Sequence, residues 1–487
     1  MGDIVKARFG AALKGLVVAT RAASVAVVAV AAPSAIAWAQ EVDTPEGSPE
    51  QAPAAASAGE AGKDSETLTG DWGGLRTDLS DAGLKLSGFY TGEALGNPRG
   101  GIRQRGVAEG LLEVDLDADL ETLVGWKGAI MHASMFQIHG RGLSSNFVGN
   151  QLTVRDIEAA PSTRLWALWV QQSFANDAAS LRVGQLPEQE EFVVSSLGAY
   201  FINGTFGWPI GMAANMPSGG GAYPLAMTAA RLKVKLSDET SWMVAVFNGD
   251  PAPGSAVQEP DPTRRNRDGL NFSFREPPAY FTEFSHAVNQ DKDSPGLPTT
   301  YKLGGWYHTG RFNDLRFDDT GRSLADPLSS GAPRQHQGNG GIYGIIDHML
   351  WRRPGTEDVG IGIFTRQMIA PPDRSAMPYY GEVGLTWKGM LEGRDDDVAG
   401  IAVAYGATSD RLSGRDRDAN AFGTPTAVRD HETAVELLYR AQLTPWWTVI
   451  PDVQYIIHPG GGVGLPDDAA QRIPDALVVG LRTVFKL

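Results

Sequence analysis

The sequence predicts an all-β fold, a transmembrane antiparallel β-barrel, from three observations. After the N-terminal forty residues, no apolar run reaches the length of about 20 residues that a membrane-spanning helix needs. Segments of about ten residues alternate between apolar and polar side chains, and Gly, Pro, Asn and Asp separate these segments. Long irregular stretches join several of them. A barrel with short turns at one end and long extracellular loops at the other has this pattern.

Residues 1–39 have the three parts of a secretory signal peptide. A basic start that includes Lys6 leads into an Ala/Val-rich stretch, and residues 37–39 form a small-x-small cleavage site. A retained anchor helix is the alternative. Arg21 and Pro33 interrupt the apolar stretch, however, and leave it shorter than a bilayer-spanning helix. We therefore expect cleavage after residue 39.

Residues 40–66 are predicted to be a flexible linker. They are mainly Pro, Ala, Gly, Ser and acidic residues, so they have little apolar surface whose burial could offset the entropy lost on ordering. Residues 67–487 are predicted to form the barrel domain. A domain of this length, with long loops, fits about sixteen strands better than about eight or twenty-two.

Composition excludes several classes of protein. Without residues 1–39 the chain has 38 basic and 56 acidic residues, a net charge of −18. Nucleic-acid surfaces need clustered Lys and Arg, so no nucleic-acid partner is expected. The chain has no Cys, which excludes disulfides, Cys-ligated zinc and thiol catalysis.

Alternation is clearest in two segments. In the first, apolar and acidic residues take turns, and the two faces are Leu112, Val114, Leu116, Ala118 and Leu120, and Glu113, Asp115, Asp117 and Asp119. A soluble sheet with one wet face would show the same pattern. The second segment, residues 477–487, places an apolar face opposite Arg482 and Lys486. We expect it to be a final strand that pairs with the first strand and closes the barrel.

Irregular stretches and tryptophans mark the two ends of the expected barrel. The long stretches between strands are residues 187–228, 250–268, 289–300, 313–340 and 406–430. Trp126, Trp387 and the pair Trp446-Trp447 stand beside predicted turns. This placement suits an aromatic girdle at the membrane interface, and the alternative is that these are ordinary core tryptophans.

A series of motifs resembles the OprB-type carbohydrate-selective porin family across nearly the whole chain after the linker. In order they are LTGDWGGLR (68–76), QIHGRGLS (137–144), RVGQL (182–186), NGTFGWP (203–209), VFNGDP (246–251), WYHTGRF (306–312), QLTPWW (442–447) and QYIIHPGG (454–461). The resemblance implies a sixteen-stranded barrel in the bacterial outer membrane with a narrow, sugar-accepting channel.

Sugar recognition calls for aromatic rings and for paired hydrogen-bond donors and acceptors, because a sugar is neutral and rich in hydroxyls. Part of residues 185–231 is expected to fold into the lumen as a constriction. The alternative is an external cap that never meets the solute. The candidate residues in this stretch are Gln185, Glu190, Glu191, Asn203, Trp208 and Arg231.

Arg164, Trp169 and Arg182 form a second candidate group, in which the face that bears Trp169 and Gln171 is expected to line the lumen. Their guanidinium groups could bind sugar hydroxyls. Opposite Glu113, Asp115 and Asp117 they would create a field across the channel. For any single residue, a salt bridge within the wall is the alternative interpretation.

The sequence therefore predicts passive diffusion of small neutral sugars, with monosaccharides such as glucose as the expected solutes. The chain lacks His-Glu-x-x-His, Gly-x-Ser-x-Gly and Gly-Lys-Ser/Thr motifs, so no enzyme activity, metal site or cofactor is expected. Outer-membrane lipid and lipopolysaccharide are the expected surroundings, and association into a homotrimer is left open. The alternatives are a non-selective diffusion porin and a secreted soluble β-protein that binds or cleaves sugars.

Overall fold

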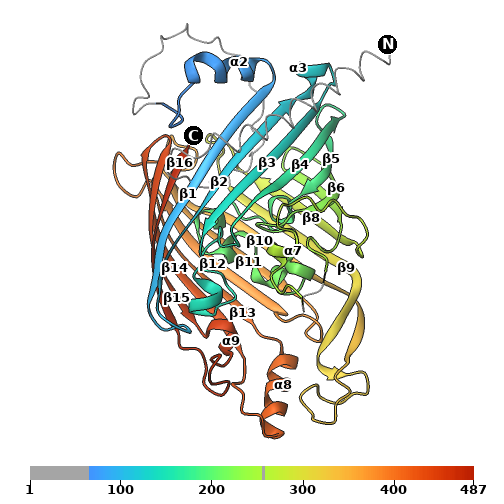
Figure 1. Ribbon diagram of the computed structural model, residues 1–487. Coiled ribbons are helices and arrows are strands. Elements are labelled where there is room, and N and C mark those ends of the chain that lie inside the picture. Colours follow the sequence, from blue (N-terminus) through green and yellow to red (C-terminus); the bar gives the residue numbers. More distant parts are fainter. Residues whose placement is uncertain (1–64, 255–257) are drawn as a thin grey trace.

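The alternating segments form sixteen antiparallel strands that close into a barrel (Figure 1). The structure is a computed structural model, and it describes residues 65–254 and 258–487. The predicted signal peptide and all but the last two residues of the predicted linker lie outside the described residues. The strands are β1 (Leu84–Arg99), β2 (Gly106–Asp119), β3 (Ala129–Gly140), β4 (Ser162–Phe174), β5 (Ala179–Leu186), β6 (Met227–Lys235), β7 (Thr240–Phe247), β8 (Ala279–Val288), β9 (Thr299–Asp318), β10 (Pro333–Arg352), β11 (Gly360–Ile369), β12 (Tyr379–Lys388), β13 (Val398–Ala407), β14 (His431–Thr444), β15 (Trp447–Ile457) and β16 (Ala476–Lys486).

Closure depends on the pairing of the first strand with the last. Each strand pairs with its neighbours in the chain, and β1 pairs with β16 from Phe89 opposite Lys486 to Arg99 opposite Leu477. Among these sixteen described strands no edge is left open to lipid, where unpaired backbone groups would be costly. The predicted pairing of residues 477–487 with the first strand is confirmed.

Burial follows the strand alternation, but with the polar side chains inside. Leu437 is 55% exposed and Leu481 is 49% exposed, whereas their neighbours Glu436 and Arg482 are at most 1% exposed. Neighbouring side chains in a strand point to opposite faces. The exposed apolar side therefore faces lipid, and the buried polar side faces the barrel interior.

The two ends of the barrel differ in the length of their connections. At one end, called here the short-turn end, the connections are residues 120–128, 175–178, 236–239, 289–298, 353–359, 389–397 and 445–446. At the other, called the long-loop end, they are residues 100–105, 141–161, 187–226, 248–278, 319–332, 370–378, 408–430 and 458–475. The C-terminus lies at the short-turn end, at the top of Figure 1.

Three expectations about local structure need correction. Residues 289–298 are a connection at the short-turn end, so they are not one of the long loops. Half of residues 313–340 belongs to β9 and β10, because these polar residues continue the strand pairing on a long hairpin (Figure 1), and residues 319–332 form the connection between the two strands. Strand β2 ends at Asp119, whose side chain caps a helix that begins at Leu120.

Helical segments are short and occur in the connections and before β1. They are η1 (Trp72–Gly74), α2 (Leu75–Asp81), α3 (Leu120–Val124), η2 (Ser144–Val148), α4 (Glu188–Glu191), η3 (Gly198–Tyr200), α5 (Gly204–Gly207), α6 (Ile210–Ala213), η4 (Pro217–Gly219), α7 (Pro262–Arg265), α8 (Asp410–Ala421) and α9 (Pro459–Gly462). Within residues 65–254 and 258–487, no helix combines the length and the apolar character that crossing a bilayer requires.

The tryptophans singled out in the sequence gather at the short-turn end. Trp126 is 50% exposed and Trp387 is 41% exposed. Trp446 and Trp447 stack on each other and on Phe485, with ring centroids 5.4–6.4 Å apart. Tryptophans gathered at one end of the barrel, two of them exposed, agree with an interfacial girdle.

Candidate functional site

The loop of residues 187–226 lies inside the barrel, where strands on other walls hold it. Glu436 on β14 accepts hydrogen bonds from the backbone N–H groups of Ile202 and Asn203 at 3.0 and 2.9 Å. The loop starts after β5, and β14 lies nine strands further along a sixteen-strand barrel. The loop therefore crosses the lumen to reach Glu436.

Further inward-facing side chains fix the same loop. Glu283 on β8 accepts from the backbone N–H of Val193, and Asp347 on β10 accepts from that of Ser196, both at 3.1 Å. Arg366 on β11 donates to loop carbonyls, among them that of Phe206 at 2.8 Å. These buried bonds satisfy the loop backbone, which has no ladder of its own.

A second loop, residues 141–161, also enters the lumen, and sequence reasoning missed it. Its Arg155 forms ion pairs with Glu93 on β1 at 3.1 Å and with Asp452 on β15 at 2.7 Å. Its Asp156 pairs with Arg482 on β16. The charged residues of this loop did not indicate that it enters the lumen, because their ion-pair partners are distant in the sequence.

Arg182, Arg231 and Glu191 form one cluster at the wall of the lumen, called here the Arg–Glu cluster. Arg182 on β5 is the direct cross-strand partner of Arg231 on β6. Like charges in that position repel each other. Glu191 from the loop lies between them, with one oxygen 2.6 Å from Arg182 Nη1 and the other 2.7 Å from Arg231 Nε.

The two guanidinium groups determine the charge state of Glu191. Burial alone would raise the pKa of its carboxyl group, but Arg182 and Arg231 hold that pKa below its ordinary value. Gln171 on β4 completes the arrangement, since its Oε1 accepts from Arg182 Nε at 3.1 Å and from Arg231 Nη2 at 3.2 Å. The cluster is therefore a fixed set of charged donors and acceptors.

Trp169 lies against this cluster, but other side chains contact its ring. The Arg182 guanidinium is 3.7 Å from the ring centroid, and His132 stacks on the ring at 4.9 Å. The ring is thus not an open stacking platform. Its Nε1–H is buried and has no hydrogen-bond partner among the described residues.

Gln185 and Glu190 gather around Trp166 on β4. Trp166 Nε1 donates to Glu190 Oε1 at 2.7 Å, and Gln185 Nε2 donates to the Trp166 carbonyl at 3.1 Å. Burial raises the pKa of Glu190 to about 7. A register shift between β3 and β4 lies beside Trp166. As a result both Trp166 and Trp169 point inward. Strict alternation would place these two residues on opposite faces of the strand.

Three predicted residues lie away from the Arg–Glu cluster. Arg164 is 2% exposed and donates to the Asn266 carbonyl at 2.7 Å. Asn203 donates to Gln454 Oε1 on β15 at 2.9 Å. Trp208 donates to the Gly219 carbonyl at 3.0 Å within the loop. Asn203 and Trp208 thus hold the loop in shape.

The predicted field between arginines and acids across the channel does not form from the expected groups. Glu113, Asp115 and Asp117 are on β2, and only β3 and β4 separate β2 from β5. They belong to the same side of the barrel as Arg182. Asp117 instead binds His132 on the neighbouring strand at 2.7 Å.

Comparison with known proteins agrees with this architecture. The profile of the carbohydrate-selective porin family OprB matches residues 104–487. The chain belongs to the OprB family. Porin B of Pseudomonas aeruginosa is 25% identical to this porin over 450 residues, which cover 88% of this chain and 94% of Porin B. The high-pH structure of Pseudomonas putida OprB superposes with a TM-score of 0.75 at 23% identity, covering 87% of this chain and 99% of the other, and it shows the shared fold.

Family and fold together make this protein a carbohydrate porin of the bacterial outer membrane. The secreted soluble β-protein is therefore the wrong alternative. The sixteen-stranded barrel that the sequence resemblance implied is confirmed.

Proposed function

We propose that this porin lets small neutral monosaccharides such as glucose diffuse passively into the periplasm, and that the Arg–Glu cluster is the part of the channel that contacts them. The observation that carries the proposal is the difference in exposure between the two arginines. The Arg182 side chain is 17% exposed and the Arg231 side chain 5%, while Glu191 anchors both. Arg182 is then the donor that faces the solute, and the more buried Arg231 lies beside it on the neighbouring strand.

Sugar hydroxyls can exchange for water at such a site without a large change in free energy. Arginine offers several N–H donors in a fixed plane, and Gln171 and Glu191 supply acceptors beside it. A channel must also release its solute, so the expected affinity is in the millimolar range, about −4 kcal/mol.

Liposome swelling tests this proposal. Replacing Arg182 with Ala removes the exposed donor, and we expect the rate of glucose entry relative to that of a neutral amino acid to fall by about 3- to 10-fold, as for the loss of one or two hydrogen bonds. Arg264→Ala is the matched control, because Arg264 is exposed in α7 away from the cluster. An unchanged ratio in Arg182→Ala would remove the cluster from the solute path.

We also propose that transport involves no covalent chemistry, so glucose recovered from the liposomes is unchanged. The orientation of the barrel in the membrane, its lipid surroundings and its oligomeric state are part of the same proposal. The long-loop end faces the medium, lipopolysaccharide surrounds its rim, and a homotrimer is the oligomer to test by chemical crosslinking in membranes.

Export is proposed to follow the sequence pattern of the N-terminus. Residues 1–39 are removed as a signal peptide, and residues 40–66 remain as a linker ahead of the barrel. N-terminal sequencing of the protein from outer membranes should begin at Gln40. A mature protein that retains the basic start at Lys6 would contradict this proposal.

A further inference from the structure

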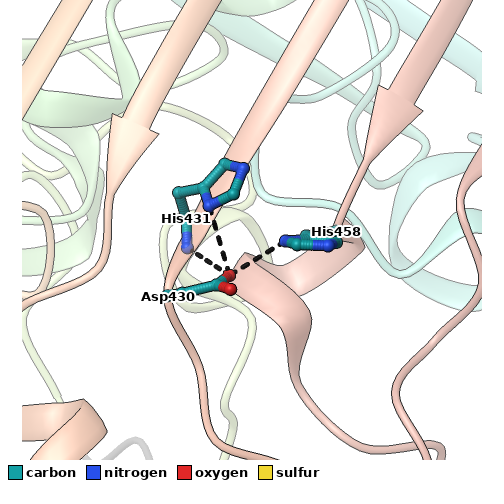
Figure 2. A group of neighbouring side chains, drawn as sticks. All are labelled: Asp430, His431 and His458. Carbon is teal, nitrogen blue, oxygen red and sulfur yellow. Dashed lines mark hydrogen bonds and ion pairs between the residues drawn. The ribbon is translucent and has the colours of Figure 1, made fainter.

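Two histidines and an aspartate meet at the long-loop end, outside the Arg–Glu cluster. Asp430 ends the loop of residues 408–430, His431 begins β14, and His458 follows β15 (Figure 2). Each side chain offers one ligand atom, and these three atoms lie within 4.8 Å of one another. The cluster thus joins two loops that are separate in the sequence.

The spacing of the donor atoms is that of neighbouring ligands around a metal ion. Asp430 Oδ1 is 3.3 Å from His431 Nδ1 and 2.9 Å from His458 Nδ1. Ligands about 2.1 Å from a divalent ion are separated by roughly 3.0 Å in octahedral and roughly 3.4 Å in tetrahedral geometry. Only the two imidazoles need to approach each other for all three donors to share one ion.

Contacts outside the cluster already orient each ligand. The His431 ring stacks on Tyr405 with centroids 5.2 Å apart. The backbone N–H of His458 donates to the Asp475 side chain at 2.9 Å. His458 has a φ of 52°, an uncommon left-handed conformation that fixes the direction of its side chain. Such supporting contacts hold metal ligands in place in known sites.

Arg472 engages the same aspartate without occupying the oxygen that a metal ion would use. Its Nη1 lies 2.9 Å from Asp430 Oδ2 and 3.4 Å from His458 Nδ1. Asp430 Oδ1 accepts from the backbone N–H of His431 at 2.6 Å and also faces the side chains of the two histidines. The simplest alternative is that Asp430 serves only as an ion-pair partner for Arg472 and His458. That alternative assigns no role to His431 Nδ1, which lies 3.3 Å from the same oxygen.

We propose that Asp430, His431 and His458 bind one divalent transition-metal ion, with zinc as the reference ion. Imidazole nitrogen with carboxylate oxygen is a donor set that suits zinc, copper and nickel. Three protein ligands leave a coordination position for water. The ion would join residues 408–430 to residues 458–475 and so stiffen the rim of the mouth. The nearby Arg472 cation weakens binding, so micromolar rather than nanomolar affinity is expected.

Isothermal titration calorimetry with Zn²⁺ tests the site. The protein is purified in detergent without a histidine tag, freed of lipopolysaccharide and treated with EDTA. We expect one equivalent of Zn²⁺ to bind, and His431→Ala and His458→Ala each to weaken binding by at least about tenfold. His286→Ala is the matched control, since His286 is on β8 near the short-turn end, and it should bind as the wild type does.

Two results would overturn the proposal: no saturable binding of one equivalent by the wild type, or Zn²⁺ affinity in the two histidine variants equal to that of the wild type. Heat-dependent gel mobility shows that each variant is folded. A second measurement uses the wild type alone. Zn²⁺ should slow tryptic cleavage after Arg472, which lies in the loop of residues 458–475, and an unchanged cleavage rate would count against the proposal.

Discussion

Glu191 is the residue that lets two arginines stand opposite each other on neighbouring strands. Without its carboxylate, Arg182 and Arg231 would face each other across one strand pair, joined by the neutral Gln171, which accepts from both. The carboxylate comes from the loop and not from the barrel wall. Docking of the loop therefore also offsets part of the positive charge of the two arginines on the barrel wall.

Replacing Glu191 with Gln keeps the shape of the side chain but removes its charge. Breaking a buried ion pair in this way typically costs about 3 kcal/mol or more, so we expect a lower midpoint of unfolding in guanidinium chloride. The channel should also become more selective for anions in reversal-potential measurements. Glu392→Gln, at an exposed position, is the control, and equal behaviour of the two variants would contradict this role of Glu191.

At the scale of single residues, the sequence predicted which side chains could bind a sugar better than it predicted where those side chains lie. Arg182, Glu191 and Arg231 meet, as their shared stretch suggested. Trp208 and Asn203 lie in the same stretch of sequence as these residues but not in the cluster. Trp208 donates to the loop itself, and Asn203 donates to Gln454 on the far wall. The partners of a loop side chain depend on how the loop crosses the lumen, and that path is set by acids on distant strands.

The loop of residues 187–226 is the element whose docking should depend on pH. Burial raises the pKa of Glu190 to about 7 and that of Glu188 to about 8. The folded loop thus keeps these protons in a pH range where an unfolded carboxyl group has already lost them. The stability that they contribute is complete below the unfolded value of about 4.3 and is lost as the pH rises through the folded values.

Hydrogen exchange followed by mass spectrometry measures this effect. After correction for intrinsic rates, amides of the loop should exchange faster at pH 9 than at pH 6, while strand amides should change little. In a Glu188→Gln, Glu190→Gln variant, the difference between the two pH values should shrink, because Gln stays neutral. Loop protection that stays constant or grows with pH would contradict this assignment.

At the scale of elements, alternation located strands well where one face meets lipid. The prediction for residues 477–487 rested on such a face. The prediction of an irregular stretch over residues 313–340 was correct for 319–332 and wrong for the two ends, because polar residues on both faces of the β9–β10 hairpin resemble a loop. The register shift beside Trp166 was equally hidden, since a bulge leaves the composition of a strand unchanged.

The whole molecule combines an apolar outer wall with a charged interior that two loops partly fill. The barrel was predictable because lipid imposes the same demand on every strand. The path of the loops inside the barrel was not predictable, because it depends on ion pairs between residues far apart in the chain, such as Arg155 with Asp452. The cluster of Asp430, His431 and His458 escaped notice for the same reason.

Single-channel recording in planar bilayers tests the central claim, that sugars pass through and interact with this lumen. Glucose added to one side should reduce the ion current in a saturable way, with half of the effect at millimolar concentration, and a neutral amino acid at the same concentration should not. A glucose effect no larger than the change in bulk conductivity of the solution would contradict the account.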